Sequence, residues 1–164
     1  MQTFLPYPDF AESAGCLDRQ RLGKQRIEAK TLLKAIMRVD LIRALKPDHG
    51  KVGWEHHPAF RMWRPYPVAL AMYMKAVIDE WVFRGYKNAA QKVEVVGKDV
   101  LVTLHEGWKP LTFSIDHLVM PPWIGNEAFH ASHRSNLLRK NPLRYGLLGW
   151  REPPTLPYVW PDPR

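Results

Sequence analysis

The sequence of 164 residues contains a single cysteine, Cys16. One thiol cannot form an internal disulfide and cannot supply a zinc site made of several cysteines. No stretch approaches the roughly 18 apolar residues of a membrane span, and residues 1–10 hold no cation and no sustained apolar run of the signal-peptide kind. These absences predict a protein of the reducing cytoplasm.

Two common catalytic patterns are also missing. The sequence has no glycine-rich phosphate loop and no Ser-His-Asp order, which argues against nucleotide hydrolysis and acyl transfer. An apolar content of 46% with 12% aromatic residues indicates a packed globular protein. At this length we expect residues 1–164 to form a single domain.

Acidic residues are scarce in two basic stretches. Arg19–Lys51 contains ten Lys or Arg and three acids, so it carries +7 (10 − 3) of the formal net charge of +8. Arg134–Arg151 adds five cations and no acid. Two such stretches suggest one positive surface for a polyanion. Because Trp and Arg are interleaved there, nucleic acid is favoured over a merely solubilising surface.

Apolar residues recur at helical spacing in two segments, which predicts a mainly α fold. The first helix is expected to begin at Asp9 or Asp18, both acceptable N-caps, and to reach about Arg38. Its apolar stripe is Leu22, Ala29, Leu33 and Ile36. The second helix ends near Gly85. Its stripe is Leu70, Met74, Val77, Ile78 and Trp81.

The second half of the sequence is more varied. Residues 93–104 are β-branched around Gly97, Lys98 and Asp99, which predicts a small hairpin. A third helix is expected from the N-cap Asn126 to Lys140. The tail from residue 151 is too rich in proline for a helix or central strand, and we expect it to lie along the surface. The fold class is a compact helical single domain with one small β-hairpin and a proline-rich C-terminal tail.

The segment RQRLGKQRIEAK, residues 19–30, carries five cations and one carboxylate, Glu28. On a helix Arg26 falls inside the apolar stripe, while Glu28 lies on its flank beside Lys24. A charged Arg in that place needs either an acid from elsewhere or a cleft that receives an anion. Glu28 is either an ordinary i,i+4 partner of Lys24 or a carboxylate at the wall of a phosphate-binding groove. The pattern alone leaves both readings open.

Three stretches occur in an order that resembles the pyrimidine-dimer DNA glycosylases, which are small, mainly helical base-excision enzymes. They are LDRQRLGKQRIEA, MWRPYPVALAMYMKAVIDEWVFRGY and SHRSNLLRKNPLRY. The resemblance implies a glycosylase, with or without AP-lyase activity, that removes damaged or modified pyrimidines from double-stranded DNA in repair or in defence against modified phage DNA.

The resemblance also implies roles for individual residues. Glu28 follows Gln20 by eight residues, as the essential acid of the family follows a helical glutamine. The residues that the resemblance implies contact DNA are Gln20, Arg21, Lys24, Arg26, Arg134, Arg139, Lys140, Tyr145 and Trp150.

Position 2 departs from the family. Its bifunctional members attack C1′ of the sugar with the α-amino group of a small residue exposed by removal of methionine, and an amine with a pKa near 8 suits this chemistry. Here the bulk of Gln2 opposes removal of Met1. The nucleophile is then the amine of Met1, the amine of Gln2 if processing occurs, or a water activated by Glu28.

Two other functions remain open at this point. One is a non-catalytic DNA-binding module, in which Glu28 only pairs with Lys24. The other is a metal-dependent nuclease that uses His130 and His133, which are spaced i,i+3. We expect no cofactor, no metal and no membrane partner, and nothing in the sequence demands more than a monomer associated with the nucleoid. A cyclobutane dimer, a ring-damaged pyrimidine and a hypermodified base all suit such a protein as substrates.

Overall fold

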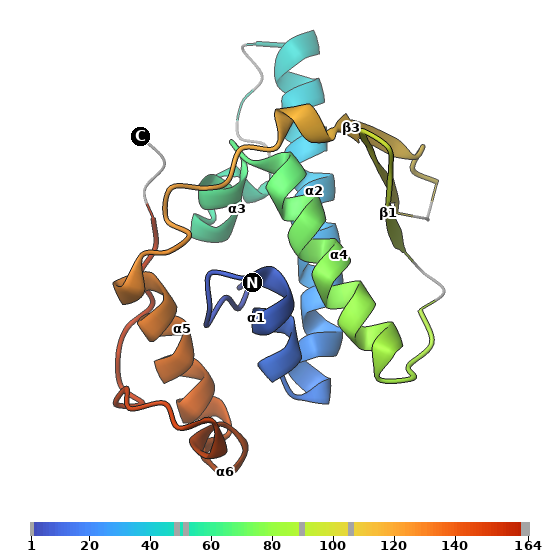
Figure 1. Cartoon of the computed structure of the whole chain (residues 1–164). Coiled ribbons are helices and arrows are strands. Elements are labelled where there is room, and N and C mark those ends of the chain that lie inside the picture. Colours follow the sequence, from blue (N-terminus) through green and yellow to red (C-terminus); the bar gives the residue numbers. More distant parts are fainter. Residues whose placement is uncertain (1, 48–49, 51–52, 89–90, 105–106, 162–164) are drawn as a thin grey trace.

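The computed structural model describes residues 2–47, 50, 53–88, 91–104 and 107–161. Figure 1 shows the elements in chain order. The α-helices of the described chain are α1 (Phe10–Cys16), α2 (Arg19–Leu45), α3 (Pro58–Trp63), α4 (Pro67–Phe83), α5 (Glu127–Lys140) and α6 (Pro142–Tyr145). The strands are β1 (Lys92–Val96), β2 (Asp99–Thr103) and β3 (Leu111–Ser114). The mainly α fold class is confirmed.

Both predicted N-caps are used, so the expected first helix is two helices. The carboxylates of Asp9 and Asp18 each accept a bond from the backbone N–H three residues later, which satisfies one free donor at each helix start. Leu17 adopts an extended ψ of 140° and separates α1 from α2. Helix α2 then continues past Arg38 to Leu45, because no proline or glycine interrupts it there.

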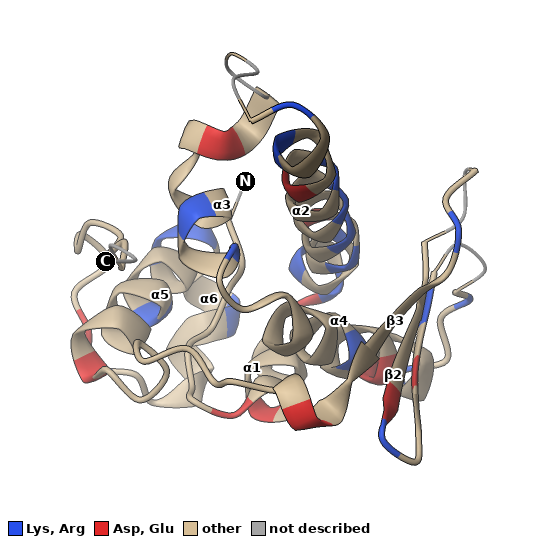
Figure 2. Cartoon of the chain, turned by 90° about the horizontal axis from the view of Figure 1, so that it is seen from above, with Lys and Arg blue, Asp and Glu red and all other residues tan. Residues whose placement is uncertain are grey.

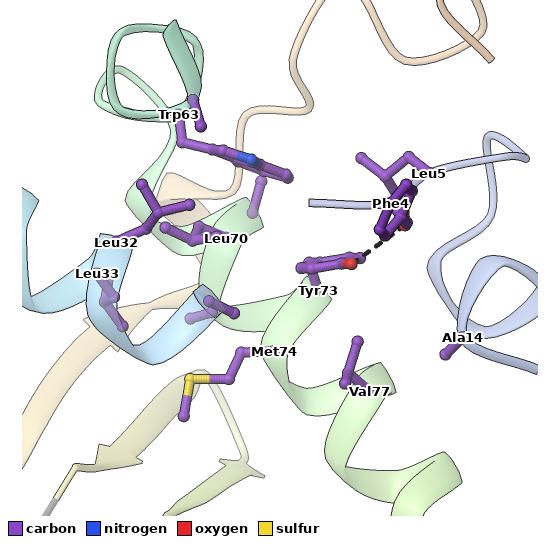
Figure 3. Packing of buried hydrophobic residues seen from close by; sticks show 14 of the residues in the cluster. Phe4, Leu5, Ala14, Leu32, Leu33, Trp63, Leu70, Tyr73, Met74 and Val77 are labelled. Carbon is purple, nitrogen blue, oxygen red and sulfur yellow. Dashed lines mark hydrogen bonds between the residues drawn. The ribbon is translucent and has the colours of Figure 1, made fainter. Parts of the chain in front are cut away.

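The core lies where α2 packs against α4, with α3 and the N-terminal segment closing it (Figure 3). All four residues of the predicted α2 stripe are fully buried, as are Leu70, Met74 and Val77 of α4. Trp63 of α3 is also fully buried and has its indole edge on to Trp123. Trp81 departs from the prediction, since it is only half-buried at the end of the α4 stripe.

The predicted hairpin is present, and a third strand joins it. Strands β1 and β2 pair antiparallel around Gly97, which has a positive φ of 60° that favours glycine. Strand β3 pairs with the other edge of β2, giving the order β1-β2-β3. The third strand was not predicted, since its four residues follow a proline and are too short for a clear alternation.

Helix α5 begins at the predicted N-cap Asn126, whose side chain accepts the N–H of Phe129. The proline-rich tail runs back along α5, held by hydrogen bonds to its side chains. Ser135 Oγ donates to Pro153 O and accepts from Leu156 N. The tail therefore needs no secondary structure of its own to stay in place.

In the part of the chain that the structure describes, the helices are too short or too polar to cross a lipid bilayer.

Candidate active site

The N-terminal segment, residues 2–6, is buried in the middle of the molecule between α2, α4 and α5 (Figure 1). The backbone of this segment forms its hydrogen bonds with side chains and not with a neighbouring strand. Phe4 N donates to Gln25 Oε1 at 2.9 Å, and Gln25 Nε2 donates to Gln2 O at 3.0 Å. The hydroxyl of Tyr73 donates to the same Gln25 Oε1 at 2.7 Å and lies 3.1 Å from Phe4 O (Figure 3). Gln25 therefore fixes the start of the chain against α2.

Glu28 faces this segment. Its Oε2 accepts the backbone N–H of Gln2 at 2.8 Å and lies 3.4 Å from Gln25 Nε2. The side chain is half-buried. Among the described residues no ion pair joins it to Lys24, so the simple i,i+4 pairing is not what orients the carboxylate. Met1, the other predicted catalytic residue beside Gln2, lies outside the described residues.

The carboxylate lines a cavity of about 320 Å³. Its walls come from the N-terminal segment, α2, the end of α5 and the tail. The lining residues are Gln2, Phe4, Gln20, Arg21, Lys24, Gln25, Glu28, Lys140, Tyr158 and Trp160. Three of them are cations and Glu28 is the one acid in this set, so the cavity can hold an anionic ligand against a single carboxylate.

Arg21 and Lys24 carry the positive charge of the α2 wall. Arg21 Nη1 pairs with Asp18 Oδ2 at 2.7 Å, and its Nη2 lies 3.4 Å from Lys140 O. Burial raises the pKa of Asp18, but hydrogen bonds from the Arg21 N–H and the Tyr145 hydroxyl outweigh it and hold the pKa below its usual value. Lys24 is exposed. Figure 2 shows the cations gathered along α2.

Arg26 is half-buried beside the cavity rather than in it. Its Nη1 donates to Asn88 Oδ1 at 2.7 Å, and its guanidinium lies 4.0 Å from the centre of the Trp81 ring. Burial lowers its pKa. Among the described residues no carboxylate lies within ion-pair distance of it. In place of the acid that the sequence analysis considered, the structure gives Arg26 an amide and an indole as neighbours.

Arg134 lies apart from the cavity, and only 8% of it is exposed. Its Nε donates to Glu152 at 2.6 Å, its Nη1 to Pro6 O at 2.7 Å, and its Nη2 pairs with Glu127. These bonds tie α5 to the tail and to the N-terminal segment. Each of the three guanidinium nitrogens therefore has a partner inside the protein, and the predicted contact of Arg134 with DNA stays a prediction.

The predicted residues at the end of α5 and after it also fall into two groups, those that line the cavity and those that do not. Lys140 is exposed and lines the cavity, whereas Arg139 is exposed outside it and bonds Asn136. Tyr145 is fully buried and stacks on Trp150 with ring centres 5.6 Å apart. Its hydroxyl donates to a carboxylate oxygen of the α2 N-cap at 2.8 Å. Both aromatic residues hold α6 against the rest of the protein.

His130 and His133 hold the N-terminal segment from the other side. His133 Nδ1 accepts Leu5 N–H at 3.0 Å, and His130 Nδ1 lies 2.8 Å from Leu5 O. His130 Nε2 accepts Gly125 N–H, so its proton is on Nδ1, and that of His133 is on Nε2. Burial lowers the pKa of His130 and lowers that of His133 to about 3. Within the described residues no three His, Cys, Asp or Glu gather to hold a metal ion.

Four residues of the cavity were not predicted as site residues, and one of them is Phe4 of the N-terminal segment. Tyr158 and Trp160 come from the tail, and the only signal for them is that they are aromatic residues in a segment that cannot form regular structure. Gln25 is on α2 five residues after Gln20, but its bonds to Gln2, Phe4 and Tyr73 are tertiary and leave no trace in local spacing.

The fold and the cavity together define a small helical protein with one carboxylate in a cationic pocket. Comparison with protein families matches residues 1–93 to the pyrimidine dimer DNA glycosylase family, and the chain belongs to this family. Membership identifies it as a DNA glycosylase. Comparisons with curated proteins and with solved structures found no match.

The matched residues include the N-terminal segment and α1 to α4, and therefore Glu28 and the cationic face of α2. The remaining walls of the cavity, Lys140, Tyr158 and Trp160, lie outside the match.

Proposed function

We propose that the protein opens the N-glycosidic bond of an altered pyrimidine in double-stranded DNA, with the sugar of the target nucleotide in the Glu28 cavity. The observation that supports this most directly is the 2.8 Å hydrogen bond between Gln2 N and Glu28 Oε2 inside a cationic cavity. It brings the start of the chain and the predicted essential acid together, although they are 26 residues apart in sequence.

In this proposal the phosphates beside the target are held by Arg21, Lys24 and Lys140, and Gln20 contacts the nucleotide from the same wall. The target nucleotide leaves the base stack so that C1′ can reach Glu28. As the glycosidic bond breaks, positive charge develops on the sugar, and the ionised Glu28 stabilises it at short range. The base departs with the bonding electron pair and takes up a proton.

We further propose that an α-amine at the start of the chain attacks C1′, from Met1 or from Gln2 if Met1 is removed. The amine nitrogen bonds to C1′ as the base leaves, and it loses a proton to solvent. The C1′–O4′ bond then breaks, O4′ takes up a proton and becomes a hydroxyl, and the nitrogen lone pair forms the C1′=N bond of a protonated imine. Glu28 then removes a C2′ proton, and the 3′ phosphate departs by β-elimination. Without the amine, a water activated by Glu28 attacks C1′ and the abasic product stays uncleaved.

The test of the proposed acid is Glu28→Gln. This variant keeps the shape of the side chain and its place beside Gln2 N, but it removes the charge. We expect base release from a substrate duplex to fall by at least about 100-fold while DNA affinity is retained. Unchanged base release by the variant would reject the assignment, and no release by the wild type from dimer, ring-damaged or hypermodified duplexes would leave a DNA-binding module.

The amine route has a separate test. Sodium borohydride reduces an imine to a stable amine, so a reaction through the chain's amine traps a covalent protein–DNA adduct, which peptide mass mapping assigns to residue 1 or 2. Base release with no trapped adduct would contradict the amine route and leave hydrolysis by water.

A further inference from the structure

A second hollow lies next to the Glu28 cavity, on the other side of one row of α2 side chains. Its lining residues are Arg19, Gln20, Gly23, Lys24, Arg26, Ile27, Glu28 and Trp81. The two hollows share Gln20, Lys24 and Glu28. These are spaced i, i+4 and i+8, so they form one row along the helix, and this row is the wall between the hollows.

The second hollow has a built floor. Trp81 rests on Gly23, where a Cβ would come within 3.1 Å of the indole. Glycine within a helix is less favourable than alanine, and here it gives the ring room against the α2 backbone. The indole Nε1 donates to Lys87 O at 2.9 Å, and the ring centre of Tyr86 lies 4.4 Å from that of Trp81. The indole is therefore fixed from several sides.

Cations surround this floor without matching acids. The guanidinium of Arg26 lies over Trp81, and Arg19 lies 5.0 Å from the centre of the Tyr86 ring. Arg26 Nε has no hydrogen-bond partner among the described residues. Stacked aromatic and guanidinium planes beside unpaired positive charge are the usual means of holding an unstacked nucleotide.

The wall between the hollows fits a phosphate. Successive nucleosides of one strand are joined by a phosphate. If one nucleoside lies in each hollow, the phosphate that joins them lies over the outer edge of the wall. The exposed outer edge of the wall carries the ammonium of Lys24 and the amide of Gln20. A nucleotide of the opposite strand has no covalent link across the wall and would give Lys24 no such bridging group.

We propose that the Trp81–Arg26 hollow binds the nucleoside next to the target on the same DNA strand, with the joining phosphate on Lys24. This rests on the proposed function, in which the target sugar occupies the Glu28 cavity. The neighbouring base stacks on the Trp81–Arg26 pair. For a dimer lesion, the neighbour is the nucleotide that flanks the lesion.

The test is a double-mutant cycle on binding, with duplexes that carry a tetrahydrofuran abasic analogue at the target position. A second tetrahydrofuran replaces the neighbour on its 5′ side, on its 3′ side, or opposite the target. We expect Trp81→Ala to weaken binding of the singly substituted duplex by about 10-fold, a typical loss for one base–aromatic contact. On the duplex that lacks the neighbouring base on one side, the variant should bind as well as the wild type.

Coupling to the base opposite the target, or no coupling to either neighbour, would overturn the proposal. Phe83→Ala is the matched control, since Phe83 is an aromatic residue of the same helix that is 86% exposed and lines neither hollow. It should bind every duplex like the wild type.

Two further variants cover a folding failure. Trp81→Phe should keep most of the coupling, and Gly23→Ala should weaken it by displacing the indole while every aromatic residue stays in place. If both variants melt at the wild-type temperature but Trp81→Phe loses the coupling or Gly23→Ala keeps it in full, the hollow is not the neighbour's site. Binding is measured in the Glu28→Gln background, so a failure of base release and a failure of this cycle are read separately.

Discussion

Two arginines, Arg26 on α2 and Arg134 on α5, come from the two basic stretches of the chain and have opposite surroundings. On α2, Arg26 has an amide and an indole for neighbours and no acid among the described residues. On α5, Arg134 is buried between Glu152, Glu127 and a carbonyl of the N-terminal segment. Positive charge in sequence therefore does not by itself indicate a DNA surface. Whether an acid from another element lies beside a given arginine depends on the fold.

The largest expected effect is a loss of folding stability when Arg134 is replaced. Arg134→Met leaves Glu152 without its partner in a site of low exposure, where breaking a buried pair costs about 3–5 kcal/mol. Urea unfolding should show that loss. Arg139→Met, on the same helix but exposed, is the control and should change stability by about 0.5 kcal/mol or less. An Arg134→Met protein as stable as the wild type would show that the buried contacts of Arg134 do not stabilise the fold.

The second prediction concerns pH and again involves α5. Burial lowers the pKa of His133 to about 3 from an ordinary 6.5. Between these two pH values the imidazole is protonated in the unfolded chain and neutral in the folded protein. This stabilisation is fully present above about pH 6.5 and is lost as the pH falls towards 3. At pH 5 it amounts to about 2 kcal/mol of lost stability.

The measurement is the free energy of unfolding between pH 5 and 7. His133→Gln, which cannot titrate, should be less stable near pH 7 but should lose less on acidification than the wild type. Equal losses in both proteins would place the acid sensitivity elsewhere.

The smallest expected effect belongs to α2. Lys24→Met should leave stability within about 0.5 kcal/mol of the wild type, because Lys24 is exposed and has no ion pair among the described residues. It should weaken DNA binding and reduce the slope of log affinity against log salt by about 0.9, the value for one phosphate contact.

The control for Lys24 is Lys98→Met at the hairpin turn, where the lysine pairs with Asp116. It should leave the salt slope unchanged. Equal slopes for the wild type and Lys24→Met would remove Lys24 from the phosphate contacts.

The features that could be predicted from sequence are those set by neighbours along the chain. Asp9, Asp18 and Asn126 cap helices because a carboxylate or amide three residues before a free N–H is enough. The hairpin at Gly97 follows in the same way from local conformation. The stripes of α2 and α4 are buried as their period requires.

The parts that could not be predicted depend on partners far along the chain. Nothing near Arg134 indicates that it will meet Glu152 and Pro6 O, and nothing near Tyr145 indicates that it will support the N-cap of α2. The resemblance to the family drew attention to Glu28 from sequence alone, but its contact with Gln2 required the fold.

The way the first residues are held has a consequence for the protein during its synthesis. Leu5 leaves the ribosome early, but the two imidazoles that bind its peptide group belong to residues made at least 125 positions later. Contacts of such sequence separation form late in folding. A nascent chain thus has Glu28 and the cations of α2 long before the cavity around them is closed, since Lys140, Tyr158 and Trp160 of its wall are made later.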